Sequence, residues 1–408
     1  MNDYSSAPSI RDLPVTATRQ VSTFGRLIGG CVVAVLFMGS TLLTPLYDLY
    51  STTYHLSVLG LGVLYAVYVI GNLVALLFFG RLSDQVGRRP IALASLALAA
   101  LSTFLFLFAR GPTWLFAARI ISGLGVGLGS GAATAWITEF TPEAKRTSAA
   151  SMMTAFNFAG LALGVMSAGL LVQYEPHPLR LPFEMYLVLL TVLALFVART
   201  PETLRARSQI DLKPRLGVPS GARLPFIAPA AGGFAAMAIV GFYAALGPTT
   251  LKHSLHVVNS ALSGAVVAEL FVVAALVIVA TRHLTARATM MIGLMTIPIG
   301  VVLLVVAQRY GSLTIMLLSA SFCGLSAALA YRGGLAVAGT LTPPERRAEV
   351  ASSYFVCCFI GNALPIIGVA ALTKFNGADV ASLVFAGVLS IISVAALVAA
   401  RFALSARS

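Results

Sequence analysis

Long apolar runs, separated by short polar gaps, occupy most of the 408-residue chain. Each run approaches or exceeds the roughly twenty residues that a helix needs to cross a bilayer. Lipid cannot satisfy exposed backbone groups, so a helix is the economical conformation for each run. The pattern predicts twelve membrane-spanning helices, at residues 27–49, 57–79, 91–109, 114–136, 148–172, 183–199, 226–249, 259–281, 288–307, 313–338, 350–372 and 380–400.

The distribution of charge predicts how these helices are oriented. Only 10% of the residues are charged, but 27 basic and 14 acidic residues give a net charge of +13. With the N-terminus inside, 20 of the 27 lysines and arginines fall in inside segments, five fall outside, and Arg119 and Arg332 lie within spans. This asymmetry favours a multi-pass protein of the bacterial inner membrane with both termini in the cytoplasm. The basic excess then faces anionic lipid, and no nucleic-acid partner is expected.

A polar interval divides the twelve spans six and six. Residues 199–224 carry six basic residues and three prolines, with no apolar run. We expect an N-terminal cytoplasmic tail, a six-helix bundle, a cytoplasmic linker, a second six-helix bundle and a C-terminal tail, at residues 1–26, 27–199, 200–224, 225–402 and 403–408.

An internal repeat relates the two halves. The segment 141–146 (TPEAKR) follows the fourth span, and 342–347 (TPPERR) follows the tenth, at an offset of 201 residues. The same offset pairs Gly123 with Gly324 and Gly160 with Gly361. Duplicated six-helix halves are typical of transporters, whose substrate site lies between the halves near the bilayer midplane.

The loop between the second and third spans carries a specific motif. Residues 80–90 read GRLSDQVGRRP, which resembles the G-x-L-x-D-x-x-G-R-[RK] signature of the major facilitator superfamily. The span count, the linker and the repeat extend the resemblance over the whole chain. It implies an all-α membrane fold of two six-helix bundles, related by a pseudo-two-fold axis, that alternates access by rocking.

In that family the loop latches the cytoplasmic side in the outward-open state. The glycines of the loop are expected to allow a tight turn and close helix approach. The aspartate is expected to form an ion pair with a neighbouring arginine, and Glu139 is the expected partner of Arg81 or Arg88. The predicted latch comprises Gly80, Arg81, Asp84, Gly87, Arg88 and Glu139.

The fourth span contains an arginine. Residues 119–125 (RIISGLG) resemble the R-x-x-x-G-x-G element of the drug:proton antiporter branch, in which the arginine is linked to proton movement. A charge inside a span is costly and usually functional, so Arg119 is a predicted proton-coupling residue. The alternative is that it snorkels to the outer headgroups. Residues 164–169 (GVMSAG) lack the proline of the G-P-x-x-G-G element of that branch. This difference weakens the prediction of antiport but not the resemblance to the superfamily.

Glu269 is the acid predicted to lie deepest in the membrane, near the centre of the eighth span. Such a carboxylate is costly unless it faces a wet cavity, pairs with a cation or takes up a proton. We therefore predict that Glu269 couples transport to protons. A permanently protonated structural acid and a direct contact to a cationic substrate are the alternatives.

Polar and aromatic residues in the spans that line the cavity in this family are the candidate substrate-binding groups. Tyrosines near span ends also form interfacial belts, but Tyr68 lies close to mid-span. The candidates are Tyr65, Tyr68, Asn72, Asn157, Tyr243, Tyr331, Arg332, Tyr354 and Asn362.

Other chemistry has little support in the sequence. The chain has no Walker A sequence, and the alternating glycines of 123–131 lie in an apolar span with no preceding strand. His253 and His256 have no neighbouring carboxylate or cysteine, and the four cysteines sit in apolar runs without metal-ligand spacing. We expect no enzyme activity, no cofactor and no metal site.

The combined pattern predicts a monomeric secondary active transporter. It is expected to export a small organic compound, either a drug or a metabolite such as a sugar, in exchange for protons. Proton-coupled uptake is the alternative within transport. A non-transporting membrane sensor or scaffold is the alternative outside it, and it leaves Glu269, Arg119 and the loop motif unexplained.

Overall fold

A computed structural model describes residues 15–142, 146–204, 209–214, 216–343 and 346–405, and no strand occurs among them. Residues 1–14 and 406–408, which are parts of the predicted tails at 1–26 and 403–408, lie outside these residues, as do parts of the linker and of the repeated segments after the fourth and tenth spans. The helices are α1 Val15–Thr41, η2 Thr44–Leu46, α2 Tyr47–Tyr54, α3 Val58–Phe79, α4 Leu82–Val86, α5 Arg88–Leu107, α6 Pro112–Glu139, α7 Arg146–Tyr174, α8 Leu181–Arg199, η4 Ser220–Ala222, α9 Arg223–Ser254, α10 Ser260–Ala280, α11 Ala286–Tyr310, α12 Leu313–Thr340, α13 Arg347–Asn376 and α14 Ala378–Ser405.

Twelve helical segments among the described residues are long and apolar enough to cross a membrane, as predicted. The differences lie at the ends of the chain and within the first span. Helix α1 begins at Val15, inside the segment expected as a tail, and α14 continues to Ser405. Between α8 and η4 the described residues form no helix.

The first span is broken, which the apolar pattern does not reveal. Helix α1 ends at Thr41, and the chain continues through η2 into the short helix α2. Pro45 explains the break, because a proline has no N–H to donate and its ring clashes with the carbonyl four residues earlier. That carbonyl belongs to Thr41, the last residue of α1. The break places Asp48 on a separate short helix at one end of the molecule.

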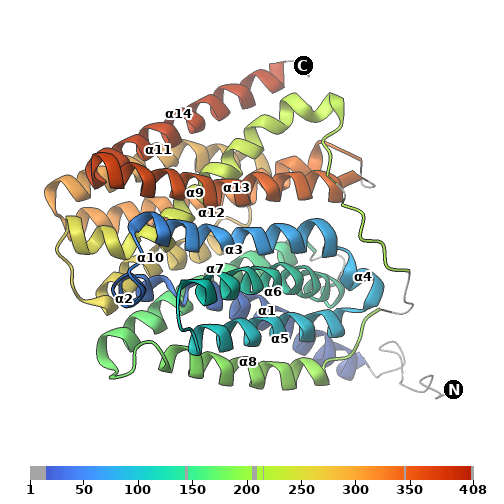
Figure 1. Ribbon diagram of the computed structural model, residues 1–408. Coiled ribbons are helices and arrows are strands. Elements are labelled where there is room, and N and C mark those ends of the chain that lie inside the picture. Colours follow the sequence, from blue (N-terminus) through green and yellow to red (C-terminus); the bar gives the residue numbers. More distant parts are fainter. Residues whose placement is uncertain (1–14, 143–145, 205–208, 215, 344–345, 406–408) are drawn as a thin grey trace.

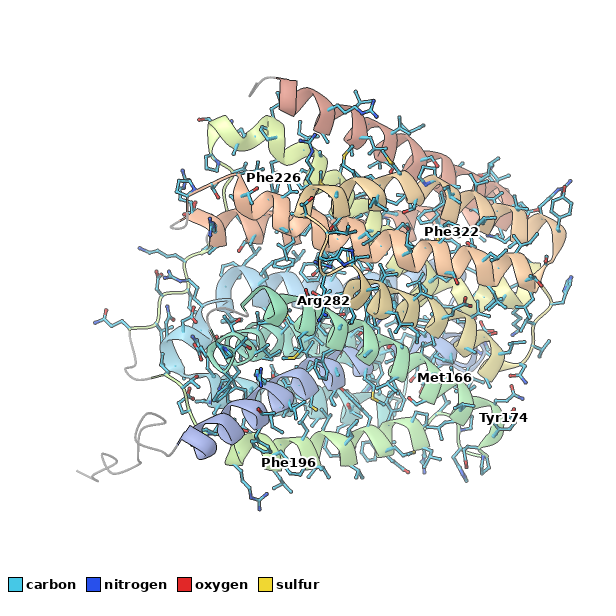
Figure 2. The ribbon with its side chains drawn as sticks, turned by 180° about the vertical axis from the view of Figure 1, so that it is seen from behind. Met166, Tyr174, Phe196, Phe226, Arg282 and Phe322 are labelled. Carbon is cyan, nitrogen blue, oxygen red and sulfur yellow. The ribbon has the colours of Figure 1, made fainter. Side chains whose placement is uncertain are left out.

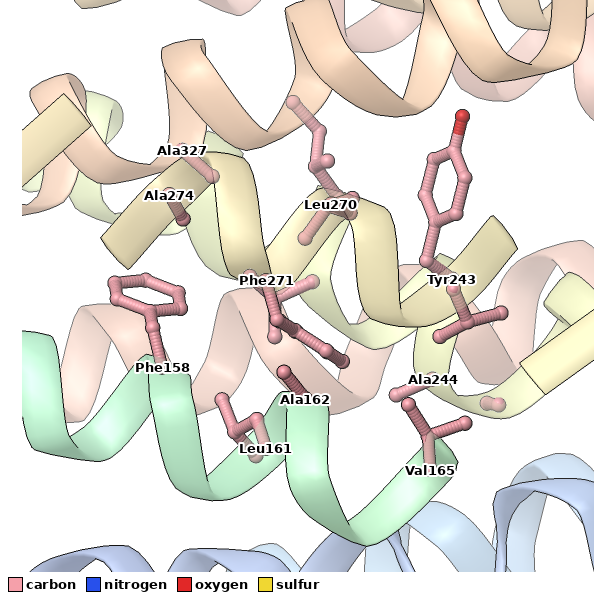
Figure 3. Packing of buried hydrophobic residues seen from close by; sticks show 14 of the residues in the cluster. Phe158, Leu161, Ala162, Val165, Tyr243, Ala244, Leu270, Phe271, Ala274 and Ala327 are labelled. Atoms are coloured by element: carbon pink, nitrogen blue, oxygen red, sulfur yellow. The ribbon is translucent and has the colours of Figure 1, made fainter. Parts of the chain in front are cut away.

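The helices form two groups in sequence order (Figure 1). Helices α1–α8, blue to green, occupy the lower part of the view, and α9–α14, yellow to red, occupy the upper part. The groups meet mainly through α3 with α13 and α7 with α10. Figure 3 shows the second pair, where Phe158 and Leu161 of α7 face Phe271 of α10, and the rings of Phe158 and Phe271 lie 6.4 Å apart.

The repeated glycines make equivalent contacts in the two halves. A Cβ atom on Gly123 of α6 would lie 2.1 Å from the carbonyl oxygen of Tyr68 on α3. A Cβ atom on Gly324 of α12 would lie 2.3 Å from the carbonyl oxygen of Leu270 on α10. Only a glycine lets the backbones approach so closely.

The second glycine pair repeats this relation with other helices. A Cβ atom on Gly160 of α7 would lie 2.1 Å from the carbonyl oxygen of Ala34 on α1, and one on Gly361 of α13 would lie 2.3 Å from that of Phe234 on α9. The offset of 201 residues in the sequence therefore corresponds to matching helix contacts in two pseudo-symmetric six-helix bundles.

The outer surface of the helices is apolar. Phe196 of α8 and Tyr174 of α7 project from the periphery in Figure 2, and the side chains of Val188, Leu276 and Ile391 are each at least 64% exposed. Contact with lipid tails accounts for so much exposed apolar surface along membrane-length helices.

Candidate functional site

A cavity of about 90 Å³ lies between the two bundles. Seven helices contribute to it: α1, α3, α6 and α7 from the first bundle, and α9, α12 and α13 from the second. The lining residues are Phe37, Ser40, Thr41, Tyr65, Tyr68, Arg119, Asn157, Phe158, Leu161, Met237, Val240, Ala244, Tyr331, Phe355, Cys358, Phe359 and Asn362.

Five of the nine predicted substrate-binding residues line this cavity, together with Arg119. They come from both bundles, and two of them connect the bundles through a hydrogen bond: the Tyr65 hydroxyl donates to Oδ1 of Asn362 over 3.0 Å. The five are Tyr65, Tyr68, Asn157, Tyr331 and Asn362.

Two of the remaining four candidates, Asn72 and Tyr243, are turned into the packing of their own bundle. The Asn72 amide is buried and donates to the carbonyl of Tyr68 over 3.5 Å. The Tyr243 hydroxyl lies 2.8 Å from Oγ of Ser319 and is also buried. Neither lines the cavity, because these helix faces meet α6 and α12 instead of the opposite bundle.

The other two candidates, Arg332 and Tyr354, also make contacts within the second bundle. Nη1 of Arg332 donates to the carbonyl of Ile278 over 3.2 Å, at the C-terminal end of α10. Cations are stabilised at helix C-termini, so this arginine has a local structural partner. The Tyr354 hydroxyl donates to the carbonyl of Tyr331 over 2.7 Å, and the whole side chain is buried. Neither residue lines the cavity.

Arg119 is 1% exposed. Its Nη1 donates to the carbonyl of Ser40 over 3.0 Å, its Nη2 to the hydroxyl of Tyr47 over 2.8 Å, and its Nε to the carbonyl of Leu64 over 3.4 Å. These partners belong to the first span and to α3. The guanidinium is therefore held inside the bundle, and the snorkelling alternative is not what the structure shows.

Two aromatic rings cover the guanidinium. Its Cζ lies 5.1 Å from the ring centroid of Tyr68 and 5.5 Å from that of Tyr65, within the range of a cation–π interaction. Among the described residues, no carboxylate lies within 4.0 Å of Arg119. The positive charge at the cavity wall is thus stabilised by dipoles and rings and is not neutralised by an ion pair.

Glu269 lies away from the cavity. Its Oε1 accepts a hydrogen bond from the Ser321 hydroxyl over 2.6 Å, which connects α10 to α12. Its Oε2 is shielded and has no partner among the described residues. On α10 it shares a face with Leu262, Val272 and Leu276, which are exposed on the outer surface. The acid therefore lies at the outer edge of the second bundle and does not line the cavity.

The loop motif forms a charge cluster with the end of α6. Arg88 is buried, and its Nη2 lies 2.7 Å from Oε1 of Glu139. The same guanidinium also pairs with Asp84 one turn earlier. Glu139 thus pairs with one of the two arginines proposed for it. Arg81 instead lies 3.8 Å from Asp211 in the α8–α9 connection, a half-exposed pair that contributes little stability.

Gly87 is the glycine that this loop requires. Its φ of +126° and ψ of 154° lie in a region open essentially to glycine alone. Gly80 has an ordinary φ of −57°, so no unusual turn occurs there. Glu202 was not among the residues predicted from the sequence, and its carboxylate accepts from the backbone N–H groups of Arg88 and Arg89 over 3.0 and 2.9 Å. A carboxylate shortly after a span is its only sequence signal.

The two ends of the contact between the bundles differ. We call the end with α4 and the α8–α9 connection the basic end, and the end with α2 the Asp48 end (Figure 1). At the Asp48 end, Asp48 pairs with Lys252 of α9 over 3.1 Å, which joins the bundles. At the basic end lies a hollow of about 380 Å³, lined by Leu76, Leu77, Phe78, Gly80, Arg81, Asp84, Asp211, Lys213, Ala348, Glu349 and Ser352.

Comparison with known proteins identifies the family. The model of the Major Facilitator Superfamily matches residues 30–278, more than half of the chain. The chain belongs to the major facilitator superfamily. With its twelve apolar helices, this member of the superfamily is a multi-pass membrane protein.

Individual relatives match over part of their length. The arabinose-proton symporter of Bacillus subtilis is 36% identical over 117 residues, which cover 29% of this chain and 24% of the symporter. The class H tetracycline resistance protein of Pasteurella multocida is 32% identical over 166 residues, which cover 37% of this chain and 40% of that protein. The chain thus matches less than half the length of either.

A solved structure extends the similarity to the whole fold. A bacterial homolog of the human lysosomal transporter Spinster, in an inward-facing and unoccupied conformation, has a TM-score of 0.65 and 16% sequence identity. The similarity covers 94% of this chain and 95% of that one. At this identity it shows a shared fold.

Proposed function

We propose that this superfamily member is a secondary active transporter that exports a small organic compound across the bacterial inner membrane, in exchange for protons. One observation carries the proposal: the cavity is walled by residues of both bundles, and among the described residues the Asp48–Lys252 ion pair joins the bundles at one end of their contact. A cavity shared by two pseudo-symmetric halves can face either side when the halves rock.

In this proposal the two ends open in turn. The Asp48–Lys252 pair closes the Asp48 end. We assign this end to the outside of the membrane, because most lysines and arginines fall in segments at the other end. Opening that end separates the pair, and the basic end closes as its hollow shrinks. Residues of the loop, including Arg81 and Asp84, line that hollow opposite Ala348 and Ser352 of α13, so closure brings the loop towards α13. The charge cluster around Arg88 holds the loop in shape throughout.

We assign proton coupling to Arg119 and Glu269. Arg119 lines the cavity and has no carboxylate partner among the described residues, so its charge is available to an ion or a charged solute that enters the cavity. Glu269 has a shielded oxygen without a partner among the described residues, and an unpaired carboxylate is costly inside a membrane-spanning helix. Because Glu269 lies outside the cavity, its coupling would act through the packing of α10 against α7 and α12.

The names of the two relatives favour different directions. Tetracycline resistance supports export, and arabinose-proton symport supports uptake as the second candidate. Inverted membrane vesicles with an acidic lumen separate the two, because antiport then concentrates solute in the lumen while symport removes it. The test is a panel of radiolabelled drugs, sugars and organic acids, with nigericin to collapse the pH gradient.

Gradient-dependent accumulation of any solute supports export. Gradient-dependent loss of preloaded solute supports uptake instead. Movement of no panel member above the level of vesicles that lack the protein would favour the non-transporting sensor or scaffold.

A further inference from the structure

The two sides of the cavity differ in polarity. Of its polar or charged side chains, all but Asn362 and the Tyr331 hydroxyl come from the first bundle: Ser40, Thr41, Tyr65, Tyr68, Arg119 and Asn157. The wall from α9 and α13 is largely apolar: Met237, Val240, Ala244, Phe355, Cys358 and Phe359. A solute that fits both walls has a polar end and an apolar body.

The charge of the cavity fixes the sign of that polar end. Arg119 is the one formally charged residue in the lining, and the lining contains no acid among the described residues. A cation buried without a counter-ion costs several kcal/mol unless another charge offsets it. The hydrogen bonds and the tyrosine rings offset part of this cost, and an anion in the cavity would offset more.

The guanidinium also retains donors for such an anion. An arginine has five N–H groups, and three donate to Ser40, Tyr47 and Leu64. Two therefore remain without a protein acceptor among the described residues. The planar fork of an arginine suits a carboxylate, whose two oxygens accept in parallel.

We propose that the cavity binds a small organic anion, with its carboxylate or similar oxyanion on Arg119 and its hydrocarbon part against α9 and α13. This inference rests on the proposed function, because it takes this cavity as the solute site. The cavity has room for only a few water molecules. The solute is therefore a compact one, such as a monocarboxylate with a single ring, or the walls separate to admit it.

Three probes with the same body and different heads test the charge class. Phenylacetate, 2-phenylacetamide and 2-phenylethylamine are nearly equal in shape and carry a negative, neutral and positive head at neutral pH. Binding to the purified full chain is measured by equilibrium dialysis with radiolabelled phenylacetate and competition by the other two. We expect phenylacetate to bind at least about tenfold more tightly than either, because a charge-assisted hydrogen bond is about twice as strong as a neutral one.

Two variants locate the preference. Arg119→Gln should reduce phenylacetate to the affinity of the amide. Asn157→Asp keeps Arg119, adds an acid to the same wall and should shift the preference towards the amine. This second variant keeps the inference falsifiable if Arg119→Gln does not fold.

Equal affinities for the three probes, a preference for the amine in the unmodified protein, or an unchanged carboxylate preference in Arg119→Gln would overturn the inference. Gradient-driven transport is read separately in vesicles. Transport without a carboxylate preference rejects the anion class alone, whereas a carboxylate preference without gradient-driven movement of any solute rejects the transport proposal alone.

Discussion

Replacing Gly87 by alanine tests how the loop between α3 and α5 is held to the segment after α8. An alanine at φ +126° and ψ 154° costs about 1–3 kcal/mol of backbone strain. Its Cβ would also lie 2.6 Å from Oε2 of Glu202, so the carboxylate must move. That oxygen accepts from the backbone N–H of Arg89, and losing such a cap costs about 1–2 kcal/mol. Together these effects predict a loss of about 2–5 kcal/mol.

Thermal unfolding in detergent, followed with a thiol-reactive dye, measures this loss. Cys323 and Cys358 are buried, so the dye reports their exposure as the helices separate. The melting temperature should fall by roughly 4–10 °C. The matched control is Gly221→Ala, because nothing lies within 4 Å of its Cβ position and its φ is not positive. That change should stay within about 0.5 kcal/mol.

A double-mutant cycle separates strain from the displaced cap. If Gly87→Ala acts partly by moving Glu202, then Gly87→Ala and Glu202→Gln together should cost about 1 kcal/mol less than the sum of the two single changes. Additive effects would show that the carboxylate is not involved. A Gly87→Ala protein as stable as Gly221→Ala would refute the reasoning entirely.

Three further changes have defined outcomes. Asp84→Asn should slow solute transport roughly tenfold while leaving binding affinity nearly unchanged, because Asp84 lies at the basic end away from the cavity. Wild-type turnover in this variant would reject the latch role of Asp84. Glu269→Gln should abolish gradient-driven transport but retain solute exchange when the pH is the same on both sides of the membrane. Full gradient-driven transport by this variant would reject the coupling role of Glu269. Gly361→Ala should lower stability by about 3 kcal/mol or more, because its Cβ would lie 2.3 Å from a carbonyl oxygen of α9. Gly368→Ala on the same helix meets nothing within 4 Å and should melt like the unmodified protein.

The fold could be predicted because its signals are local or repeated. Apolar length determines which segments span, and that property needs no knowledge of neighbouring helices. The pairing of Gly123 with Gly324 is visible in the sequence because a close backbone contact admits only a glycine at both positions. The break at Pro45 has a local cause in proline chemistry, but hydropathy does not reveal it, because apolar residues lie on both sides of the proline.

The cavity could be predicted only in part, because helix rotation is set by tertiary packing. Tyr65 and Arg332 both look like polar groups in a cavity-lining span, yet only Tyr65 faces the opposite bundle. Apolar lining residues such as Met237 and Phe359 have no sequence signal that distinguishes them from other core residues. The position of Glu269 on the outer edge of α10 follows from how α10 packs against α12. The position of a residue along its span gives its depth in the membrane but not the direction in which its side chain points.

Alternating access can be tested without knowing the solute, by measuring distances between spin labels at the two ends. One pair is placed at Thr52 and His253, exposed residues of α2 and α9 at the Asp48 end. The other is placed at Phe78 and Ala348, which line the hollow at the basic end. Each pair is measured by pulsed electron resonance in lipid nanodiscs, with and without the substitution Lys252→Gln.

Loss of the Asp48–Lys252 ion pair should favour opening of the Asp48 end. We predict that Lys252→Gln lengthens the Thr52–His253 distance and, in the same protein, shortens the Phe78–Ala348 distance, because rocking halves cannot open both ends together. Distances that stay unchanged at the basic end while the Asp48 end opens would contradict alternating access in this protein.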